Sequence, residues 1–355
     1  MLGRIKKISA VLAAGEAAFF TDDTTRQYLT GFRSSAGAVV VTRDGAYFFI
    51  DSRYFEKAQK TVTVCETVLM KKFGEQLREF LSQKGIKKLY VETSSMSVDE
   101  FYMWQKKLDG VEVSDSNIMN RILSDMRAIK SDEEIECITQ AQKITDMGFA
   151  HILEFIKVGK TEREIALELE FYMRKLGSEG TAFDFIAVSG ENSSLPHGVP
   201  TDRKIGTGDF LTLDFGAVVN GYRSDMTRTV AIGGINDEQR RVYDTVLAAQ
   251  NAALDYIRAG IIGKDADKIA RDVIENAGYG ECFGHSLGHS VGLDIHENPN
   301  FSPSCDTEIK AGTVITVEPG IYIAGKFGVR IEDMILVKED GIHNFTQSPR
   351  EFIVL

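Results

Sequence analysis

The sequence is poor in the residues that mark several protein classes. It has only four cysteines in 355 residues, and none has the C-x-x-C spacing of a metal or redox motif: Cys65, Cys137, Cys282 and Cys305. We therefore expect reduced thiols and a cytoplasmic protein. No basic block stands out, and the net charge is −11 with a pI near 5.2. This acidic balance predicts no nucleic acid and no anionic membrane surface as partners.

Long apolar runs are also missing. No window approaches the uninterrupted apolar length of a membrane span. The first residues, MLGRIKKISAVLAAG, join basic residues to a short apolar run that is too weak to predict a signal peptide. The hydrophobic fraction of 43% is nevertheless enough for a sizeable core, and the length favours more than one domain.

Residues 1–122 alternate between strand and helix patterns. Two β-rich segments flank Asp44-Gly45, which is a hairpin signature. Residues 61–69 are rich in β-branched side chains, as a strand would be, and residues 73–83 have the periodicity of an amphipathic helix. This alternation predicts a separate α/β domain. We assign the only tryptophan, Trp104, to its core.

Residues 123–355 contain helices, a strand pair, more helices and a second strand pair. Capping boxes at residues 131–134 and 161–164 begin the first two helices. The next two helices are predicted at residues 237–258 and 265–277. This order predicts a second, α+β domain with a curved, mostly antiparallel sheet backed by helices.

The two strand pairs are copies of one another. GDFLTLDFG, from residue 208, aligns without a gap on GTVITVEPG, from residue 312, and GYRSD aligns on GVRIE further along. Each copy places one acid near the end of its first strand and another in its second: Asp214 and Asp225, then Glu318 and Glu332. Four carboxylates in a semi-buried site cannot all stay ionised unless cations neutralise them. The repeat therefore predicts a metal site, with two metals, on a pseudo-twofold axis.

Four of the six histidines lie in glycine-rich or proline-rich contexts. Three occur in CFGHSLGHSVGLDIHENP and one in SLPHGVP: His285, His289, His296 and His197. The glycines argue against a helical HExxH zinc motif, so we expect a loop or edge strand that brings histidine to the acids. His197 is ambiguous by itself. His151 and His343 are assigned structural roles.

The same stretch also matches the nucleophile elbow of serine hydrolases. GHSLG and GHSVG both have the form G-x-S-x-G. That elbow needs a buried strand before it and a helix after it, and the preceding NAGYGE predicts no strand. A serine hydrolase stays the alternative mechanism, and a non-catalytic binding module of the same fold is a third hypothesis.

With these residues in place, the chain resembles the pita-bread metallopeptidases. The resemblance rests on LDFG to SDMTRT, GHSVGLDIHE, TVEPGIY and GVRIED. The family's ligand order of Asp, Asp, His, Glu and Glu is intact: Asp214, Asp225, His289, Glu318 and Glu332. The N-terminal domain favours the Xaa-Pro aminopeptidases and Xaa-Pro dipeptidases over methionine aminopeptidases, which generally lack it. The fold implied is an α/β N-terminal domain plus an α+β pita-bread C-terminal domain with an internal pseudo-twofold repeat.

The resemblance implies a homodimeric enzyme that cleaves peptides with proline at the second position, using a hydroxide that bridges two metal ions. Oxygen-rich ligation with one imidazole favours Mn²⁺, with Co²⁺ or Zn²⁺ as alternatives. Asp225 and Glu332 would bridge both metals. His197 and His296 would contact the substrate carbonyl and the oxyanion or leaving group. Glu318 would also carry a proton to the proline nitrogen.

Three residues are assigned to substrate binding. His285 would line the pocket. Arg330 would either hold a substrate carboxylate or form a structural ion pair, and the sequence does not decide between them. Phe183 would form part of an apolar wall for the proline ring, although a strand Phe is more often simply core. The choice between a dipeptide and a longer peptide also stays open.

Overall fold

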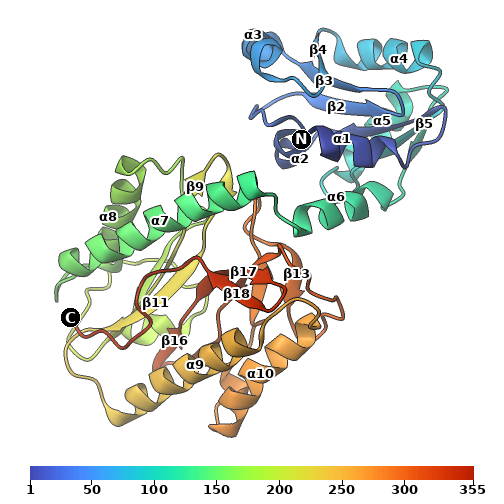
Figure 1. Ribbon diagram of the computed structural model, residues 1–355. Coiled ribbons are helices and arrows are strands. Elements are labelled where there is room, and N and C mark those ends of the chain that lie inside the picture. The colour runs from blue at the N-terminus through green and yellow to red at the C-terminus, as the bar shows by residue number, and fades with distance from the viewer. The chain divides into compact units, whose positions relative to one another are not determined.

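The computed structural model describes residues 1–355, which divide into two compact units, Met1–Met126 and Arg127–Leu355 (Figure 1). The division falls within helix α6 (Ile118–Ala128). The domain boundary that we place after residue 122 lies in the same helix and stays a prediction.

The first unit contains a mixed six-stranded sheet. Its strands in spatial order are β4 (Glu66–Leu69), β3 (Ala46–Ile50), β2 (Ala38–Thr42), β1 (Glu16–Phe20), β5 (Lys88–Val91) and β6 (Glu112–Ser114). β2 and β3 form the predicted hairpin around Asp44-Gly45. The strand pattern at residues 61–69 was wrong in its first half, because Thr61 ends a helix whose Ala58 is buried. Tertiary packing overrides local β-propensity there.

Helices complete the α/β layout of this unit. They are α1 (Leu2–Ser9), α2 (Asp23–Thr30), α3 (Ser52–Thr61), α4 (Phe73–Gln83) and α5 (Val98–Lys107). Trp104 on α5 is 7% exposed and packs edge-on against Phe19 and Phe73, with ring centroids 5.2 Å and 5.6 Å away. The predicted core role of this tryptophan is confirmed.

The second unit has two helix pairs that flank its strands (Figure 1). They are α7 (Asp132–Phe155) with α8 (Glu162–Lys175), and α9 (Asp237–Tyr256) with α10 (Gly263–Asn276). Both predicted capping boxes are present, at Ser131 and Thr161. Each pair covers a separate apolar core, since α7 and α8 pack with one copy of the repeat and α9 and α10 with the other.

Most strands of this unit form two larger antiparallel sheets, and the others form two short hairpins. One has the order β11 (Met226–Ala231), β8 (Phe210–Phe215) and β7 (Ile186–Ser189). The other has the order β13 (Glu297–Phe301), β12 (Gly288–Ser290), β14 (Val314–Val317), β17 (Asp333–Lys338) and β18 (Gly341–Asn344). Two short 3₁₀ helices, η1 (Gly190–Ser194) and η2 (Gly280–Cys282), lie between the larger elements.

Each copy of the repeat has four strands rather than the predicted two. In the first copy a short hairpin of β9 (Val218–Val219) and β10 (Tyr222–Arg223) lies between β8 and β11. In the second, β15 (Gly320–Ile323) and β16 (Phe327–Arg330) lie between β14 and β17. The Asn220-Gly221 turn has φ values of 50° and 81°, as a type I′ hairpin requires. The second acid of each copy therefore directly precedes its long strand instead of lying within it.

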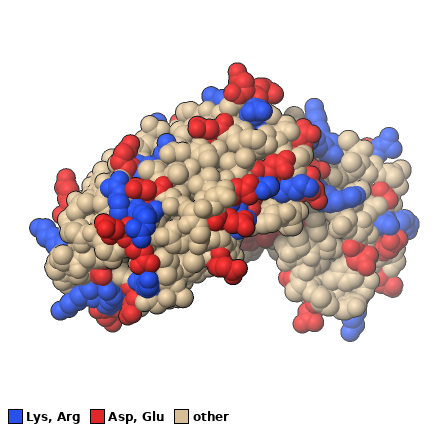
Figure 2. All heavy atoms as spheres, turned by 90° about the horizontal axis from the view of Figure 1, so that it is seen from below, with Lys and Arg blue, Asp and Glu red and all other residues tan.

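Both signs of charge are mixed on the surface. Figure 2 shows acidic and basic side chains close together on the face in view. Some form exposed i,i+4 pairs, such as Arg240–Asp244 on α9 and Lys268–Asp272 on α10, which contribute little to stability. None of the helices is both long enough and apolar enough to cross a membrane.

Candidate metal centre

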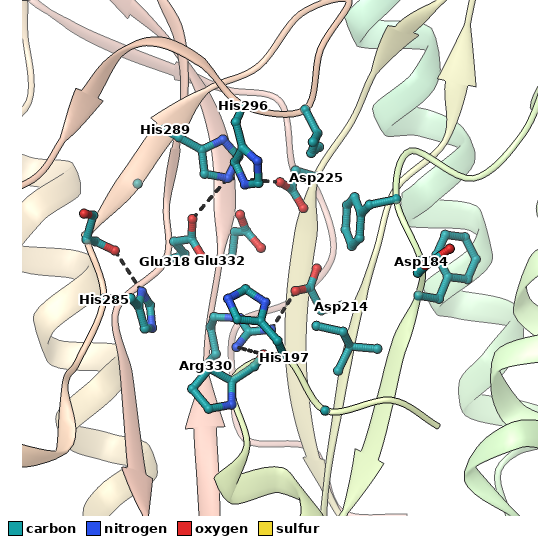
Figure 3. Close-up of a pocket in the computed structure, with 18 of the residues that line it drawn as sticks. Asp184, His197, Asp214, Asp225, His285, His289, His296, Glu318, Arg330 and Glu332 are labelled. Atoms are coloured by element: carbon teal, nitrogen blue, oxygen red, sulfur yellow. Dashed lines mark hydrogen bonds and ion pairs between the residues drawn. The ribbon is translucent and has the colours of Figure 1, made fainter. Parts of the chain in front are cut away.

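One cavity of about 700 Å³ in the second unit gathers every residue that the sequence assigned to the site. Its lining includes Phe183, His197, Asp214, Asp225, His285, His289, His296, Glu318, Arg330 and Glu332 (Figure 3). His151 and His343 are not among the lining residues; His151 instead contacts Glu168 on the outside of the α7–α8 pair. The candidate residues, which lie between Phe183 and Glu332 in the sequence, therefore converge on one place.

The repeat places the four acids symmetrically. Asp214 lies near the end of β8, and Glu318 directly follows β14, its counterpart. Asp225 directly precedes β11, and Glu332 directly precedes β17. The fifth candidate ligand, His289, comes from β12, which pairs with β14 at Ser290. The antiparallel pairs thus present carboxylates from adjacent strand ends to the cavity.

The candidate ligand atoms are close together. One atom from each of Asp225, His289 and Glu332 lies within 4.8 Å of the other two. His289 Nε2 lies 3.5 Å from Asp225 Oδ2 and 3.3 Å from Glu318 Oε1 (Figure 3). Asp214 instead accepts a hydrogen bond of 2.6 Å from Arg330 through Oδ2. Its Oδ1 and the Oε1 of Glu332 are buried without a partner.

Acceptor atoms face one another at the centre of this cluster. Nδ1 of His289 lies 3.2 Å from the carbonyl oxygen of Ser290, so Nδ1 is the protonated nitrogen. Burial lowers the pKa of His289, so its ring is neutral and Nε2 offers a lone pair to carboxylate oxygens. This arrangement is repulsive unless a cation or a proton lies between the atoms. The donor set therefore fits a divalent metal ion.

The pKa values of three of these carboxyl groups are raised because the groups are buried close together. Burial, followed by the charges of Asp214 and Glu318, raises the pKa of Asp225 well above its usual range. Burial and the charge of Asp225 do the same to Glu332, and burial raises the pKa of Glu318 to about 7. Such acids stay ionised at neutral pH only when positive charge is added.

Comparison with known proteins identifies the family. Residues 136–339 match the profile of metallopeptidase family M24, and residues 4–129 match the creatinase/prolidase N-terminal domain. The chain belongs to metallopeptidase family M24. The protein is therefore an enzyme of the metallopeptidase class, which implies divalent metal ions, and its second unit has the predicted pita-bread fold.

Relatives of this metallopeptidase match along its whole length. It is 37% identical to an Xaa-Pro dipeptidase of Pyrococcus horikoshii, over 99% of this chain and 98% of the relative. A solved Xaa-Pro dipeptidase from Bacillus anthracis is 39% identical, with a TM-score of 0.96 and coverage of 100% and 99%. An X-Pro aminopeptidase from Thermotoga maritima is 36% identical, with a TM-score of 0.91 and coverage of 98% and 99%.

His285 of the metallopeptidase is held in one neutral tautomer. Its Nδ1 donates to the carbonyl oxygen of Ser286 at 2.8 Å, which leaves Nε2 to accept from the Tyr322 hydroxyl at 3.0 Å. Burial and the charge of Arg330 lower the pKa of His285 to about 4. Tyr322 in turn accepts from Arg330 at 2.6 Å. The imidazole is thus an uncharged wall of the cavity.

Arg330 is committed to protein partners. It is 4% exposed, and its guanidinium donates to Asp214, Tyr322 and Thr227 and to one backbone carbonyl. The sequence left open whether it forms an ion pair or binds a substrate carboxylate. The structure contains the ion pair, and the side chain also reaches the cavity surface. Arg330 therefore fixes the orientation of Asp214, and its role toward the substrate stays a prediction.

The loop that carries His296 is closed by a partly buried ion-pair network. Glu297 is bound by Lys130 at 3.1 Å and by Arg127 at 2.5 Å, and Arg127 also binds Asp294 at 2.6 Å. The backbone N–H of Asp294 donates to the Glu297 carboxylate as well. The ring centroid of His296 lies 4.3 Å from that of His289, so the network holds His296 beside the candidate ligands.

His197 and Phe183 line the cavity from neighbouring segments. His197 is exposed and lies on the segment between η1 and β8. Phe183 is half-buried, with its ring centroid 6.5 Å from that of Phe185. Phe183 is therefore not simply a core residue, because part of its ring faces the cavity.

The structure lacks the nucleophile elbow that the alternative serine-hydrolase mechanism requires. Ser290 is fully buried inside β12, an antiparallel strand, and donates to the carbonyl oxygen of Pro299 at 2.6 Å. Ser286 precedes this strand instead of following one. Neither serine occupies a strand-to-helix turn, which the nucleophile elbow requires.

Two site residues were missed from the sequence. Thr227 donates to Glu332 Oε2 at 2.7 Å, and Tyr322 links Arg330 to His285. Thr227 lies two residues after Asp225, so strand alternation could have placed it on the same face. For Tyr322 only its place inside TVEPGIY offered an indication.

Proposed function

We propose that this metallopeptidase is an Xaa-Pro peptidase, which hydrolyses the peptide bond between an N-terminal residue and proline. The observation that carries the metal-dependent chemistry is the cluster of Asp225, His289 and Glu332, whose ligand atoms lie within 4.8 Å of one another beside buried acceptors without partners. The proline specificity is supported by relatives named Xaa-Pro dipeptidase and X-Pro aminopeptidase.

The proposed ligands hold two divalent ions, with Mn²⁺ favoured by four carboxylates and one imidazole. The residues that would hold them are Asp214, Asp225, His289, Glu318 and Glu332, of which Asp225 and Glu332 would serve both ions. Asp214 offers Oδ1, its unpaired oxygen, while Oδ2 stays on Arg330. When bound, such ions lower the pKa of a coordinated water and stabilise negative charge that develops on the scissile carbonyl.

The other cavity residues orient the substrate and move a proton. His197 and His296 donate to the oxygen of the scissile carbonyl, where negative charge develops. Glu318 carries a proton to the proline nitrogen, which leaves poorly without one. Neutral His285 and the Phe183 ring form the uncharged wall against the proline ring.

Metal removal tests this function. EDTA should abolish cleavage of an Xaa-Pro substrate, and Mn²⁺ or Co²⁺ should restore it, because the ligands supply no nucleophile of their own. The measurement is release of free proline or of the N-terminal residue before and after dialysis against chelator. Activity that survives thorough chelation contradicts the proposal. Two bound metals without turnover of any Xaa-Pro substrate would favour the non-catalytic binding module.

Substrate length is tested with a matched pair of peptides. The same N-terminal residue is presented in an Xaa-Pro dipeptide and in an Xaa-Pro-Xaa tripeptide, and kcat/KM is compared. Preference for the dipeptide makes the enzyme a dipeptidase, and preference for the tripeptide makes it an aminopeptidase. The homodimer and the cytoplasmic location stay predictions.

A further inference from the structure

A buried carboxylate outside the metal cluster binds both ends of the segment that carries His197. Glu162, the first residue of α8, has no exposed surface. Oε1 accepts from the N–H of Ser189 at 2.7 Å and from its hydroxyl at 2.8 Å. Oε2 accepts from the N–H of Thr201 at 3.0 Å and from its hydroxyl at 2.7 Å. The amide of Asn192 bridges the two oxygens at 3.2 Å and 3.3 Å.

These donors enclose one loop. Ser189 is the last residue of β7, Asn192 lies in η1, and Thr201 follows Pro200. Between them the chain presents His197 and Val199 to the cavity. Both side chains are exposed, Val199 by 74%. The loop is thus fixed at its base, while its tip reaches the cavity.

Only a carboxylate suits this place. Its two oxygens are acceptors alone, and here one oxygen serves each end of the loop. In a glutamine, an NH₂ group would replace one of these two oxygens. That donor would then face an N–H and a hydroxyl that donate to the carboxylate in the wild type. Every hydrogen-bond donor to Glu162 is uncharged, and the cation beside this carboxylate is Arg203, which donates to the Ser189 hydroxyl at 2.7 Å without binding Glu162 directly. Because burying a carboxylate costs desolvation free energy, we expect Glu162 to have a function beyond helix capping.

The capping function of α8 belongs to a different residue. Thr161 and Glu164 form the capping box, and Glu164 is half-exposed. The backbone N–H groups of Glu162 and Arg163 donate to the carbonyls of Arg203 and Thr201, so the helix start is joined to the far end of the loop by main chain as well. The Glu162 side chain therefore acts on the loop, not on the helix.

We propose that Glu162 is a positioning residue, whose carboxylate fixes the 189–201 loop and so holds His197 at the metal cluster. The inference rests on the proposed function, since the role of His197 toward the scissile carbonyl is part of it. Glu162 touches no substrate; it acts through the loop.

A double-mutant cycle tests the coupling. E162Q, H197A and the double variant are compared with the wild type, and E164Q is the matched control on the same helical turn. E162Q should lower kcat/KM by about 10- to 100-fold, because displacements of about 1 Å have effects of that size. Metal content should not change. H197A should remove most of the same activity, so the double variant should lose little more. E164Q should lower Tm and keep kcat/KM.

Hydrogen exchange provides a readout that does not depend on activity. E162Q should speed amide exchange in residues 190–201, and E164Q should not. If E162Q does not fold, T201V removes one donor with little change of shape and should give a smaller loss of the same kind. Effects of E162Q and H197A that multiply, or unchanged exchange in the loop, overturn the positioning role. If the wild type cleaves no Xaa-Pro substrate, the proposed function fails, and exchange still decides whether Glu162 anchors the loop.

Discussion

Asp225 is a buried acid whose surroundings favour the binding of a cation. It is 4% exposed, lies 3.5 Å from a neutral imidazole, and has a pKa raised by burial and by two neighbouring carboxylates. The first acid of the same copy, Asp214, forms an ion pair with Arg330, in which Asp214 Oδ2 lies 2.6 Å from Arg330 Nη2. The two acids of one copy therefore have different partners.

Replacing Asp225 by asparagine separates metal binding from folding. We expect D225N to lose metal and to lower kcat/KM by more than the about 10- to 100-fold that an outer-sphere partner contributes. The metal-free variant should be at least as stable as the metal-free wild type, because a crowded carboxyl is replaced by an isosteric neutral group. Metal analysis and thermal unfolding in EDTA measure both effects. Full activity in D225N would place the site elsewhere.

At the scale of elements, the glycine that follows each first acid shows why the repeat is recognisable. Gly216 and Gly320 occupy equivalent places two residues after Asp214 and Glu318. A Cβ at Gly216 would lie within 1.8 Å of the carbonyl oxygen of Ser224. At Gly320 its three nearest neighbours would be side-chain atoms of Tyr322, the first at 2.6 Å. A close approach of two backbone segments therefore requires glycine in the first copy, and a close side chain favours it in the second.

This difference predicts unequal effects of alanine. G216A should destabilise the protein by more than the about 1–3 kcal/mol of ordinary overpacking, because the obstacle is main chain next to Asp225. G320A should be milder, since a side chain can move. G234A is the control, with nothing within 4 Å of its Cβ. Thermal and denaturant unfolding of the three variants provide the measurement, and equal stability of G216A and G234A would refute the argument.

At the scale of the whole molecule, the acid cluster links stability to pH when metal is absent. The pKa of Glu318 rises from 4.5 to about 7 in the folded protein, and those of Asp225 and Glu332 rise too. The folded state therefore binds more protons than the unfolded state between these values. Its stability is greatest below the unfolded pKa and falls as pH rises through the folded pKa.

The expected result is a Tm in EDTA that falls between about pH 5 and about pH 8. Mn²⁺ should raise Tm most at the higher pH, because it supplies the missing positive charge. The control is E318Q, whose Tm in EDTA should fall less over this pH range than that of the wild type. A Tm in EDTA that does not change over this range would mean that the carboxylates are not crowded as described.

Much of the site could be predicted because the two copies of the repeat can be aligned from the sequence alone. Asp214, Asp225, Glu318 and Glu332 follow from the alignment of two copies, and all four line one cavity. The number of strands could not be predicted. A two-residue strand such as β9 has too few residues for alternation to be visible, and the hairpin forms only because its turn and neighbours hold it.

The sequence by itself determined the features that depend on near neighbours: the capping boxes at Ser131 and Thr161, the Asn220-Gly221 turn and the duplicated acids. The caps and the turn depend on contacts within a few residues, and the acids recur in two copies of one motif, so the sequence pattern shows all of them. Only the tertiary structure decided that Glu162 binds both ends of the His197 loop and that Tyr322 joins Arg330 to His285. These contacts are set by how α8 packs beside β7 and how β15 faces the glycine-rich segment, and no local pattern encodes such distances.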